Sequence, residues 1–429
     1  MSGRRIIVVG GGAAGFFAAI TCAEAAQEAE VVVLERSPEF LTKVRISGGG
    51  RCNVTHACFD AREFTSRYPR GEKELIGPFQ KFSATDTVAW FAARGVRLKT
   101  ENDGRMFPTT DSSETIRECL LRAAQAAQVK LVLNCGVEQV VRVANGFELT
   151  LTAVRRTPTQ PESGPAPQFA DSGIGAPLFC NRLLLATGGC RAAAAGQLAV
   201  SLGHTLVAPV PSLFTFQIAA KWLHELAGVS LADAEVSVPG AGLNARGPLL
   251  VTHWGLSGPS VLRLSAWGAR KLHAQDYHFP LLVNWLPMLA REQITRAIQA
   301  RRTAEGAKLV VNAPLAPLTA RLWEALVLTA GIGRDTRWSA LTRGQQHQLG
   351  QQLVRTELAV TGKSMNKEEF VTCGGVRLAE VDFKTMASRL CPGLHFAGEL
   401  LDIDGITGGF NFQAAWTTGW ITGNALAAG

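Results

Sequence analysis

Charged residues are scarce in this chain. Only 18% of its 429 residues are Asp, Glu, Lys or Arg, whereas an average soluble protein has roughly 25%, and 47% are apolar. A chain this rich in apolar residues can bury a large core, which excludes disorder as its main state. Its length allows two or three domains.

Closely spaced cysteine pairs are absent. The nine cysteines are scattered, odd in number, and none belongs to a CxxC pair. This spacing argues against a disulfide framework and against a zinc site, so we expect no metal. Free thiols persist in a reducing compartment, and we therefore predict a cytoplasmic protein.

Long apolar runs free of glycine are also absent. Two arginines precede an uncharged stretch, residues 6–23, that superficially resembles a signal peptide. Four glycines would break a hydrophobic helix there, and no other uncharged run is long and apolar enough to cross a bilayer. We expect a soluble protein that does not act at a membrane.

The first 36 residues have the pattern strand, glycine turn, helix, strand, which predicts a βαβ unit. The turn reads Gly10-x-Gly12-x-x-Gly15, and Glu35 ends the second strand 20 residues later. Glycines there let backbone N–H groups approach a pyrophosphate at the helix N-terminus, while the carboxylate accepts ribose hydroxyls. The pattern predicts a dinucleotide site; a glycine turn without ligand is the alternative.

Three further glycine clusters accompany this turn. Residues 43–53 combine backbone donors with basic side chains that can meet a flavin's pyrophosphate and ring edge. Residues 183–189, LLLATGG, form a buried strand that ends in a tight turn. Residues 398–411 lead directly into the last helix, whose N-terminus can stabilise negative charge on a reduced flavin ring.

Six sequence blocks carry a resemblance to a known family: GGGAAG, KVRISGGGRCNVT, GRMFP, LLATGG, VTHWGLSGP and GLHFAGELLDIDGITGGFNFQAA. In this order they resemble the signature blocks of a bacterial FAD-dependent oxidoreductase family that includes aminoacetone oxidases, bile-acid dehydro-reductases and the ribosomal RNA dihydrouridine synthase. The blocks span almost the whole chain. The resemblance implies an α/β fold, with a glutathione-reductase-like FAD-binding Rossmann domain built from both chain ends, an inserted β-barrel-like domain and a helical insert.

We place the FAD domain at residues 1–191 and 356–429, the β-rich domain at 192–286 and the helical insert at 287–355. The predicted FAD-binding residues are Gly10, Gly12, Ala13, Ala14, Gly15, Glu35, Arg36, Lys43, Ser47, Gly48, Gly49, Gly50, Arg51, Cys52, Asn53, Val137, Thr187, Gly188, Gly398, Glu399, Asp404, Gly408, Gly409, Phe410 and Asn411.

Two residues are candidates for catalysis. Cys52 lies beside the predicted flavin and can donate a proton if it is exposed, with its pKa lowered by Arg51 and by local backbone dipoles. A small packing residue is the alternative. His253 can donate a proton or hold a substrate carbonyl, and a packing role in a turn is its alternative.

The net charge of +8 lies in one segment, residues 260–355, which holds 13 Lys and Arg against 5 Asp and Glu. Eleven of the 13 are arginines, which suit phosphate contacts and stacking on bases. This segment therefore predicts docking of a polyanion, which the family resemblance suggests is ribosomal RNA; a solvated helical face is the alternative.

Disulfide reductases of related fold carry a second GxGxxG and a CxxxxC pair. Here Cys52 and Cys58 enclose five residues and no second fingerprint is visible, which argues against that activity. Our leading interpretation is a reductase that passes hydride from NAD(P)H through FAD to an activated C=C bond, with uridine in ribosomal RNA as the preferred substrate. Two alternatives act on small molecules: an oxidase of small amines that uses oxygen, and a reductase of steroid-like enones. A third alternative is a redox-sensing flavoprotein that binds a protein partner.

Overall fold

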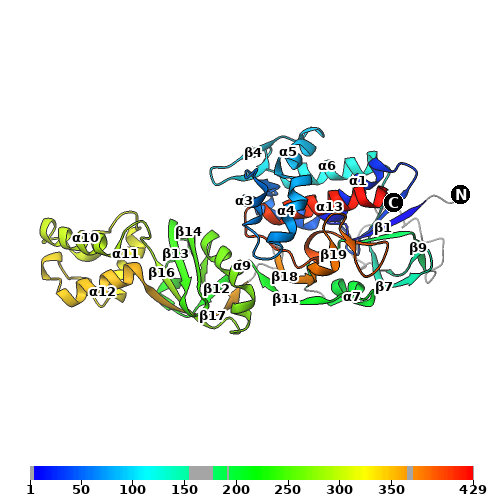
Figure 1. The fold of residues 1–429 in the computed structure, drawn as a ribbon. Helices are drawn as coiled ribbons and strands as arrows, with labels where there is room; N and C mark the ends of the chain where they lie inside the picture. The colour runs from blue at the N-terminus through cyan, green and yellow to red at the C-terminus, as the bar shows by residue number, and fades with distance from the viewer. Residues whose placement is uncertain (1–3, 154–176, 191–192, 365–370, 429) are drawn as a thin grey trace. The chain divides into compact units, whose positions relative to one another are not determined.

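The computed structural model describes residues 4–153, 177–190, 193–364 and 371–428 (Figure 1). The chain forms two compact units: unit 1 is Met1–Val210 with Lys367–Gly429, and unit 2 is Pro211–Asn366. The predicted boundaries after residues 191 and 355 differ from this division. Residues 192–210 belong to unit 1, and the strand that begins at Thr356 belongs to unit 2.

A seven-stranded sheet forms the centre of unit 1, in the order β19-β20-β21-β10-β1-β2-β6. Its strands are β1 (Arg5–Val9), β2 (Glu30–Leu34), β6 (Lys130–Val132), β10 (Arg182–Leu185), β19 (Val381–Asp382), β20 (Ala387–Ser388) and β21 (Leu394–Phe396). The pairs from β21 to β6 are parallel, and Ile6 of β1 lies between Val31 and Arg182. Because β21 follows the segment of unit 2, both chain ends build one sheet, and this part of the predicted fold is confirmed.

Two helices pack closely beside this sheet, α1 (Ala13–Ala25) and α13 (Phe410–Ala428). Glycines of α13 permit the close approach. A Cβ atom at Gly419 would lie 2.6 Å from the carbonyl oxygen of Ala14, and one at Gly423 would lie 2.5 Å from that of Ala18. Larger side chains would force the two helices apart, so the glycines allow the first and last helices of the chain to pack closely.

The remaining elements of unit 1 are α2 (Thr42–Gly50), β3 (Thr55–His56), α3 (Ala61–Thr65), α4 (Glu72–Lys81), α5 (Ala84–Ala92), β4 (Leu98–Thr100), β5 (Arg105–Pro108), α6 (Ser113–Ala126), β7 (Cys135–Val143), β8 (Gly146–Ala153), β9 (Leu178–Cys180), α7 (Ala193–Ser201), β11 (Leu206–Ser212) and β18 (Val371–Val376). Strands β3, β5 and β4 form one small sheet, and β7, β8 and β9 form another. Strand β7 begins beside the end of β2 and therefore borders the candidate site described below.

Unit 2 contains a closed barrel in the order β12-β15-β14-β13-β16-β17, so the predicted barrel is confirmed. The strands are β12 (Thr215–Ile218), β13 (Ser230–Val238), β14 (Leu243–Thr252), β15 (Gly255–Ser257), β16 (Phe279–Asn284) and β17 (Thr356–Ser364). The helices are α8 (Lys221–His224), α9 (Pro259–His273), α10 (Arg291–Ala304), α11 (Ala320–Thr329) and α12 (Arg343–Val354).

The helical insert is part of the same unit as the barrel. Helices α10 to α12 lie between β16 and β17 in the chain, and one hydrophobic cluster contains residues from both parts. Trp285 of the barrel and Trp323 and Trp338 of the insert are all fully buried in it. The 96-residue basic segment is therefore anchored by a shared core. Within the described part of the chain, no helix combines the length and apolar character needed to cross a membrane.

Candidate cofactor-binding site

The glycine turn between β1 and α1 has the geometry that a dinucleotide site requires. Gly10 has φ +114°, and a Cβ atom there would lie 2.3 Å from the carbonyl oxygen of Ala186. A Cβ atom at Gly15 would lie 2.0 Å from the carbonyl oxygen of Gly10. Gly12 differs, because a Cβ atom there would meet nothing within 4 Å. Two glycines thus shape the turn, and the third leaves an open face at the N-terminus of α1.

Glu35 lies at the other end of this site. Its carboxylate accepts hydrogen bonds from the backbone N–H groups of Gly11 (2.7 Å) and Ser37 (2.8 Å). Two bonds leave lone pairs free for ribose hydroxyls, since a carboxylate offers about four acceptor positions. Cys135 N–H donates to the Glu35 carbonyl (2.9 Å). The start of β7, which includes Val137, therefore lies beside Glu35 and Arg36.

The second predicted cluster forms the end of α2. Gly48, Gly49 and Gly50 have φ of +59°, +68° and +81°, a left-handed conformation that glycine adopts without strain. A Cβ atom at Gly49 or Gly50 would meet nothing within 4 Å. The Ser47 carbonyl accepts from Cys52 N–H at 3.0 Å and closes the loop. This loop presents a second open backbone surface, as an extended phosphate ligand requires.

Cys52 does not have the environment that we expected. Its side chain is fully buried, and burial raises the pKa of the thiol to about 12. The Arg51 guanidinium instead binds Glu101 at 2.6 Å and lies 4.0 Å above the Phe107 ring. The prediction that Arg51 lowers this pKa is therefore wrong. Desolvation of a thiolate in the core outweighs the charge of Arg51, because that charge is already paired.

The C-terminal block meets the N-terminal one in unit 1. Lys43 binds the Glu399 carboxylate at 2.6 Å, across 356 positions of sequence, and the second oxygen of Glu399 accepts from Thr372 N–H at 2.9 Å. A Cβ atom at Gly398 would lie 2.8 Å from the Cβ of Ala14. Three of the predicted clusters thus lie around the N-terminus of α1.

The LLATGG turn closes the same region after β10. Gly188, which follows Thr187, has φ +78° and open space where a Cβ would stand. A Cβ atom at Gly189 would lie 2.4 Å from the Thr372 hydroxyl and 3.0 Å from a Glu399 carboxylate oxygen. The turn is therefore open on one side and closely packed on the other.

The start of α13 is fixed by the segment after the glycine loop of α2. Gly408 and Gly409 have φ of +129° and +94°, and a Cβ atom at Gly409 would lie 2.4 Å from the Thr55 carbonyl oxygen. With its amide oriented to satisfy both groups, Asn53 accepts from Gly409 N–H (2.9 Å) and donates to Thr55 O (3.0 Å). Asn411 brackets the turn by accepting from the Gly405 N–H at 2.8 Å and donating to its carbonyl at 2.9 Å.

Three residues that we did not predict hold this turn. His56 Nδ1 donates to the Gly408 carbonyl at 3.0 Å, and its ring stacks on Phe410 at 4.8 Å between centroids. The Tyr68 hydroxyl donates to the Phe410 carbonyl at 2.5 Å. The Arg70 guanidinium binds both carboxylate oxygens of the fully buried Asp404. Only His56 had a sequence signal, because it directly follows the block KVRISGGGRCNVT, which ends at Thr55.

These residues fit an FAD molecule. The open faces at Gly12, Gly49, Gly50 and Gly188 belong to clusters that lie far apart in the sequence, and a Cβ atom at any of them would meet no protein atom within 4 Å. The backbone around Gly12 and Gly49 would hold the pyrophosphate, and Glu35 would hold the ribose. Helix α13 has no acidic residue in its first turn, so its positive end would face a flavin ring.

His253 belongs to unit 2. It is exposed in the turn between β14 and β15, with its ring 4.3 Å from that of Trp254. The Trp254 indole N–H donates to the Thr215 hydroxyl at 3.2 Å, which fixes this turn on the barrel. A role of His253 in proton transfer stays a prediction.

The burial of Cys52 leads to a test. We expect Cys52→Ala to keep FAD and to reduce substrate within about threefold of the wild-type rate, as for a small packing residue. Stopped-flow kinetics should follow flavin reduction and substrate reduction separately, since a loosened cofactor would slow both. A selective loss of about 10²-fold or more in the second step would make Cys52 a proton donor after all.

Two family models match the chain. One describes the HI0933-like protein Rossmann domain and matches residues 4–161, and the other describes the HI0933-like protein barrel and H2TH domain and matches residues 210–371. The curated relatives include the 3-dehydro-bile acid delta(4,6)-reductase of Clostridium scindens, which is 28% identical over 96% of both chains. They also include the ribosomal RNA dihydrouridine synthases of Escherichia coli, 28% identical over 96% of both chains, and Haemophilus influenzae, 26% identical over 94% of both.

Solved structures share the fold at low identity. The 3-ketosteroid delta1-dehydrogenase of Sterolibacterium denitrificans aligns over 99% of both chains with a TM-score of 0.50 and 14% identity. The Escherichia coli quinol fumarate reductase aligns over 100% of this chain and 71% of its own, with a TM-score of 0.52 and 12% identity. The two family models describe successive domains of one kind of protein and fall on units 1 and 2. The chain therefore belongs to the HI0933-like family, and it carries the Rossmann cradle and the barrel of an FAD-dependent oxidoreductase.

Proposed function

We propose that this protein reduces an activated C=C bond with hydride from NAD(P)H, and that its preferred substrate is uridine in ribosomal RNA. Two relatives with this activity in their names align with nearly the whole chain. The bile-acid relative is equally similar to this chain and is also named as a reductase. The relatives therefore support reduction, and the choice of substrate must come from this chain.

The arginines of α10 and α12 support RNA. Other cations of the insert are engaged: Arg301 of α10 binds Glu305, Arg334 binds Glu324 and Arg321 donates to the Glu225 carbonyl. The side chains of five arginines make no hydrogen bond or ion pair to any described residue; they are Arg291, Arg296 and Arg302 on α10 and Arg343 and Arg355 at the two ends of α12. A reductase of small molecules has no need for such a surface, whereas a polyanion would neutralise it. This observation carries the proposal.

The residues of unit 1 would bind the cofactor and stabilise charge on it. When bound, FAD supplies hydride transfer between a nicotinamide donor and the C=C bond. The backbone at Gly12, Gly49 and Gly50 would bind its phosphates, and Glu35 its ribose. The hydrogen bonds from His56 and Asn53 hold the turn before α13, so the helix N-terminus is already in place to stabilise negative charge. His253 is the residue we retain as a candidate proton donor.

The experiment is a gene deletion followed by mass spectrometry of ribosomal RNA. We expect one dihydrouridine to disappear and to return when purified protein and NAD(P)H are added to the isolated RNA. Persistence of every dihydrouridine in the deletion strain would contradict the proposal.

The competing functions predict other results. A steroid-like enone reductase, which the bile-acid relative favours, would reduce such enones with NAD(P)H and ignore RNA. An amine oxidase would consume oxygen with an amine and leave the RNA unchanged. A redox sensor would neither reduce enones nor oxidise amines, and it would bind a protein partner.

A further inference from the structure

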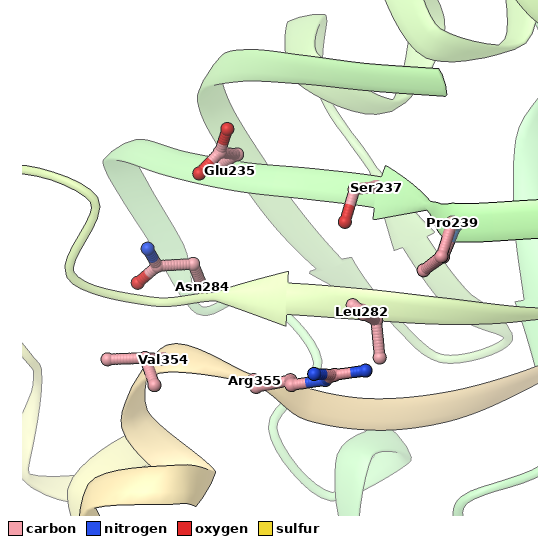
Figure 2. A pocket seen from close by; sticks show the side chains of 7 residues that line it. All are labelled: Glu235, Ser237, Pro239, Leu282, Asn284, Val354 and Arg355. Carbon is pink, nitrogen blue, oxygen red and sulfur yellow. The ribbon is translucent and has the colours of Figure 1, made fainter. Parts of the chain in front are cut away.

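A polar hollow lies on the outer wall of the barrel (Figure 2). It has a volume of about 350 Å³ and is lined by Glu235, Ser237, Pro239, Leu282, Asn284, Val354 and Arg355. These residues come from β13 and the position after it, from β16, and from the end of α12 and the position after it, so the hollow belongs wholly to unit 2. The cofactor cradle belongs to unit 1, and the hollow is therefore a separate feature.

The alternation of the strands explains why the hollow faces outward. Glu235 and Ser237 of β13 alternate with the buried Val236 and Val238. In β16, the partly exposed Leu282 and Asn284 alternate with buried residues. The register places Glu235 opposite Asn284 and Ser237 opposite Leu282. Side chains of both strands therefore line one outer surface, beside the residue that follows α12.

The polar groups of the hollow retain free hydrogen-bonding capacity. Arg355 is exposed and makes no side-chain bond to any residue that the structure describes. Asn284 Oδ1 accepts from Leu286 N–H at 3.1 Å, which leaves its NH₂ group free of described partners. One carboxylate oxygen of Glu235 accepts from Asn244 at 2.7 Å. A cation, an amide donor and a second carboxylate oxygen thus line the hollow, together with the apolar side chains of Leu282 and Val354.

We propose that this hollow binds one nucleotide of a single-stranded RNA, with Arg355 on the phosphate. A guanidinium binds phosphate through two parallel N–H groups. The amide of Asn284 and the free oxygen of Glu235 can bind a base edge or a ribose 2′-hydroxyl, and the apolar side chains of Leu282 and Val354 can contact the base. This inference rests on the proposed function, because it assigns a docking position to the same RNA.

Further arginines lie beyond the hollow, on α12 and on the neighbouring helix α10. Arg343 and Arg355 lie at opposite ends of α12, about 18 Å apart at 1.5 Å per residue. Residues 342–355, which comprise α12 and its two flanking positions, contain two arginines and no acidic residue, and Glu357 follows on β17, opposite Leu282. Helix α10 packs against α12 and adds Arg291, Arg296 and Arg302. A strand bound in the hollow would therefore meet further arginines and no carboxylate along α12.

The test measures binding of a fluorescein-labelled, single-stranded ribosomal RNA fragment to the FAD-loaded protein by fluorescence anisotropy at several salt concentrations. We expect Arg355→Ala to weaken binding about tenfold and to reduce the slope of log K against log[salt] by about 0.7, the value of one phosphate contact on a single strand. Arg355→Lys keeps the charge and should bind within about threefold of wild type. Asn284→Ala should weaken binding about threefold without changing the slope, because it removes no charge.

Arg334→Ala is the matched control. It removes an arginine from the same segment, but this arginine is already paired with Glu324. We expect its RNA affinity to stay within about twofold of wild type. Melting temperature and FAD content confirm that each variant is folded.

The outcomes separate this inference from the proposed function. If Arg355→Ala and Asn284→Ala bind RNA like the control while the wild-type protein still forms dihydrouridine, the hollow is not a nucleotide site and the proposed function stands. If the wild-type protein neither binds RNA in a salt-dependent way nor forms dihydrouridine, the proposed function fails and the inference fails with it.

Discussion

Gly12→Val is expected to give a folded protein that purifies without FAD. A valine side chain at residue 12 meets no protein atom within 4 Å of its Cβ, so the fold has room for it. The same space is where a pyrophosphate would approach the N-terminus of α1. We expect FAD affinity to fall at least about 100-fold, which corresponds to about 2.7 kcal/mol of binding free energy. Flavin absorbance per protein after purification measures the loss.

The control for this change is Gly344→Val on α12. Residue 344 also has nothing within 4 Å of an added Cβ, but it lies in unit 2. This variant should keep its full flavin content. Gly10 and Gly15 are unsuitable for the test, because a Cβ at either would collide with backbone and unfold the turn. Normal flavin content in Gly12→Val would show that the open face at residue 12 does not hold the cofactor.

The glycine turn could be predicted because its determinants are local. Gly10, Gly12 and Gly15 act within one turn, and Glu35 follows at the end of the next strand, so a short stretch of sequence contains the whole pattern. The boundary of the barrel could not be predicted in this way. Strand β17 pairs with β12 and β16, and its residues follow a helical insert that separates them from both partners. We assigned it to the FAD domain because nothing in its own sequence indicates those partners.

The partners of charged side chains could not be predicted from the sequence either. The spacing of Asp111 and Glu114 is typical of a capping box, yet α6 begins after Ser112 without a side-chain cap, and Asp111 binds Lys99. In the same way, Arg51 is adjacent to Cys52 but is bound by Glu101. Which partner a charged side chain takes depends on segments that fold beside it, and this decides whether it shifts a neighbour's pKa. Residues 157–177 are rich in proline and glycine, which predicts an exposed loop, and all but the last of them lie outside the described residues.

The ion pair of Arg70 and Asp404 joins segments 334 positions apart. We predicted that Asp404 binds FAD, and the structure shows that Arg70 binds both of its carboxylate oxygens. The Asp404 side chain is fully buried and that of Arg70 is 12% exposed. A carboxylate in this position is costly without its cation, because it has lost its hydration. The pair therefore fixes the loop before α13 whether or not Asp404 also meets the cofactor.

Arg70→Met should consequently destabilise the protein by about 3–5 kcal/mol, since it removes one partner of a buried pair. Denaturant unfolding of the purified protein measures this loss. Arg67→Met is the control, because Arg67 forms an exposed pair with Glu63 at 3.8 Å and should cost no more than about 1 kcal/mol. An equal, small effect of both changes would contradict the assignment of a buried pair.

The double variant Arg70→Met with Asp404→Leu decides what else Asp404 does. Removing both charges eliminates the uncompensated carboxylate, so most of the lost stability should return. If the stable double variant retains FAD with wild-type affinity, Asp404 serves only to hold the loop through Arg70. If it is stable but loses FAD, Asp404 contacts the cofactor as we predicted from the sequence. Unfolding and flavin titration on the same samples separate the two roles, because only the second role reduces affinity in a protein that is fully folded.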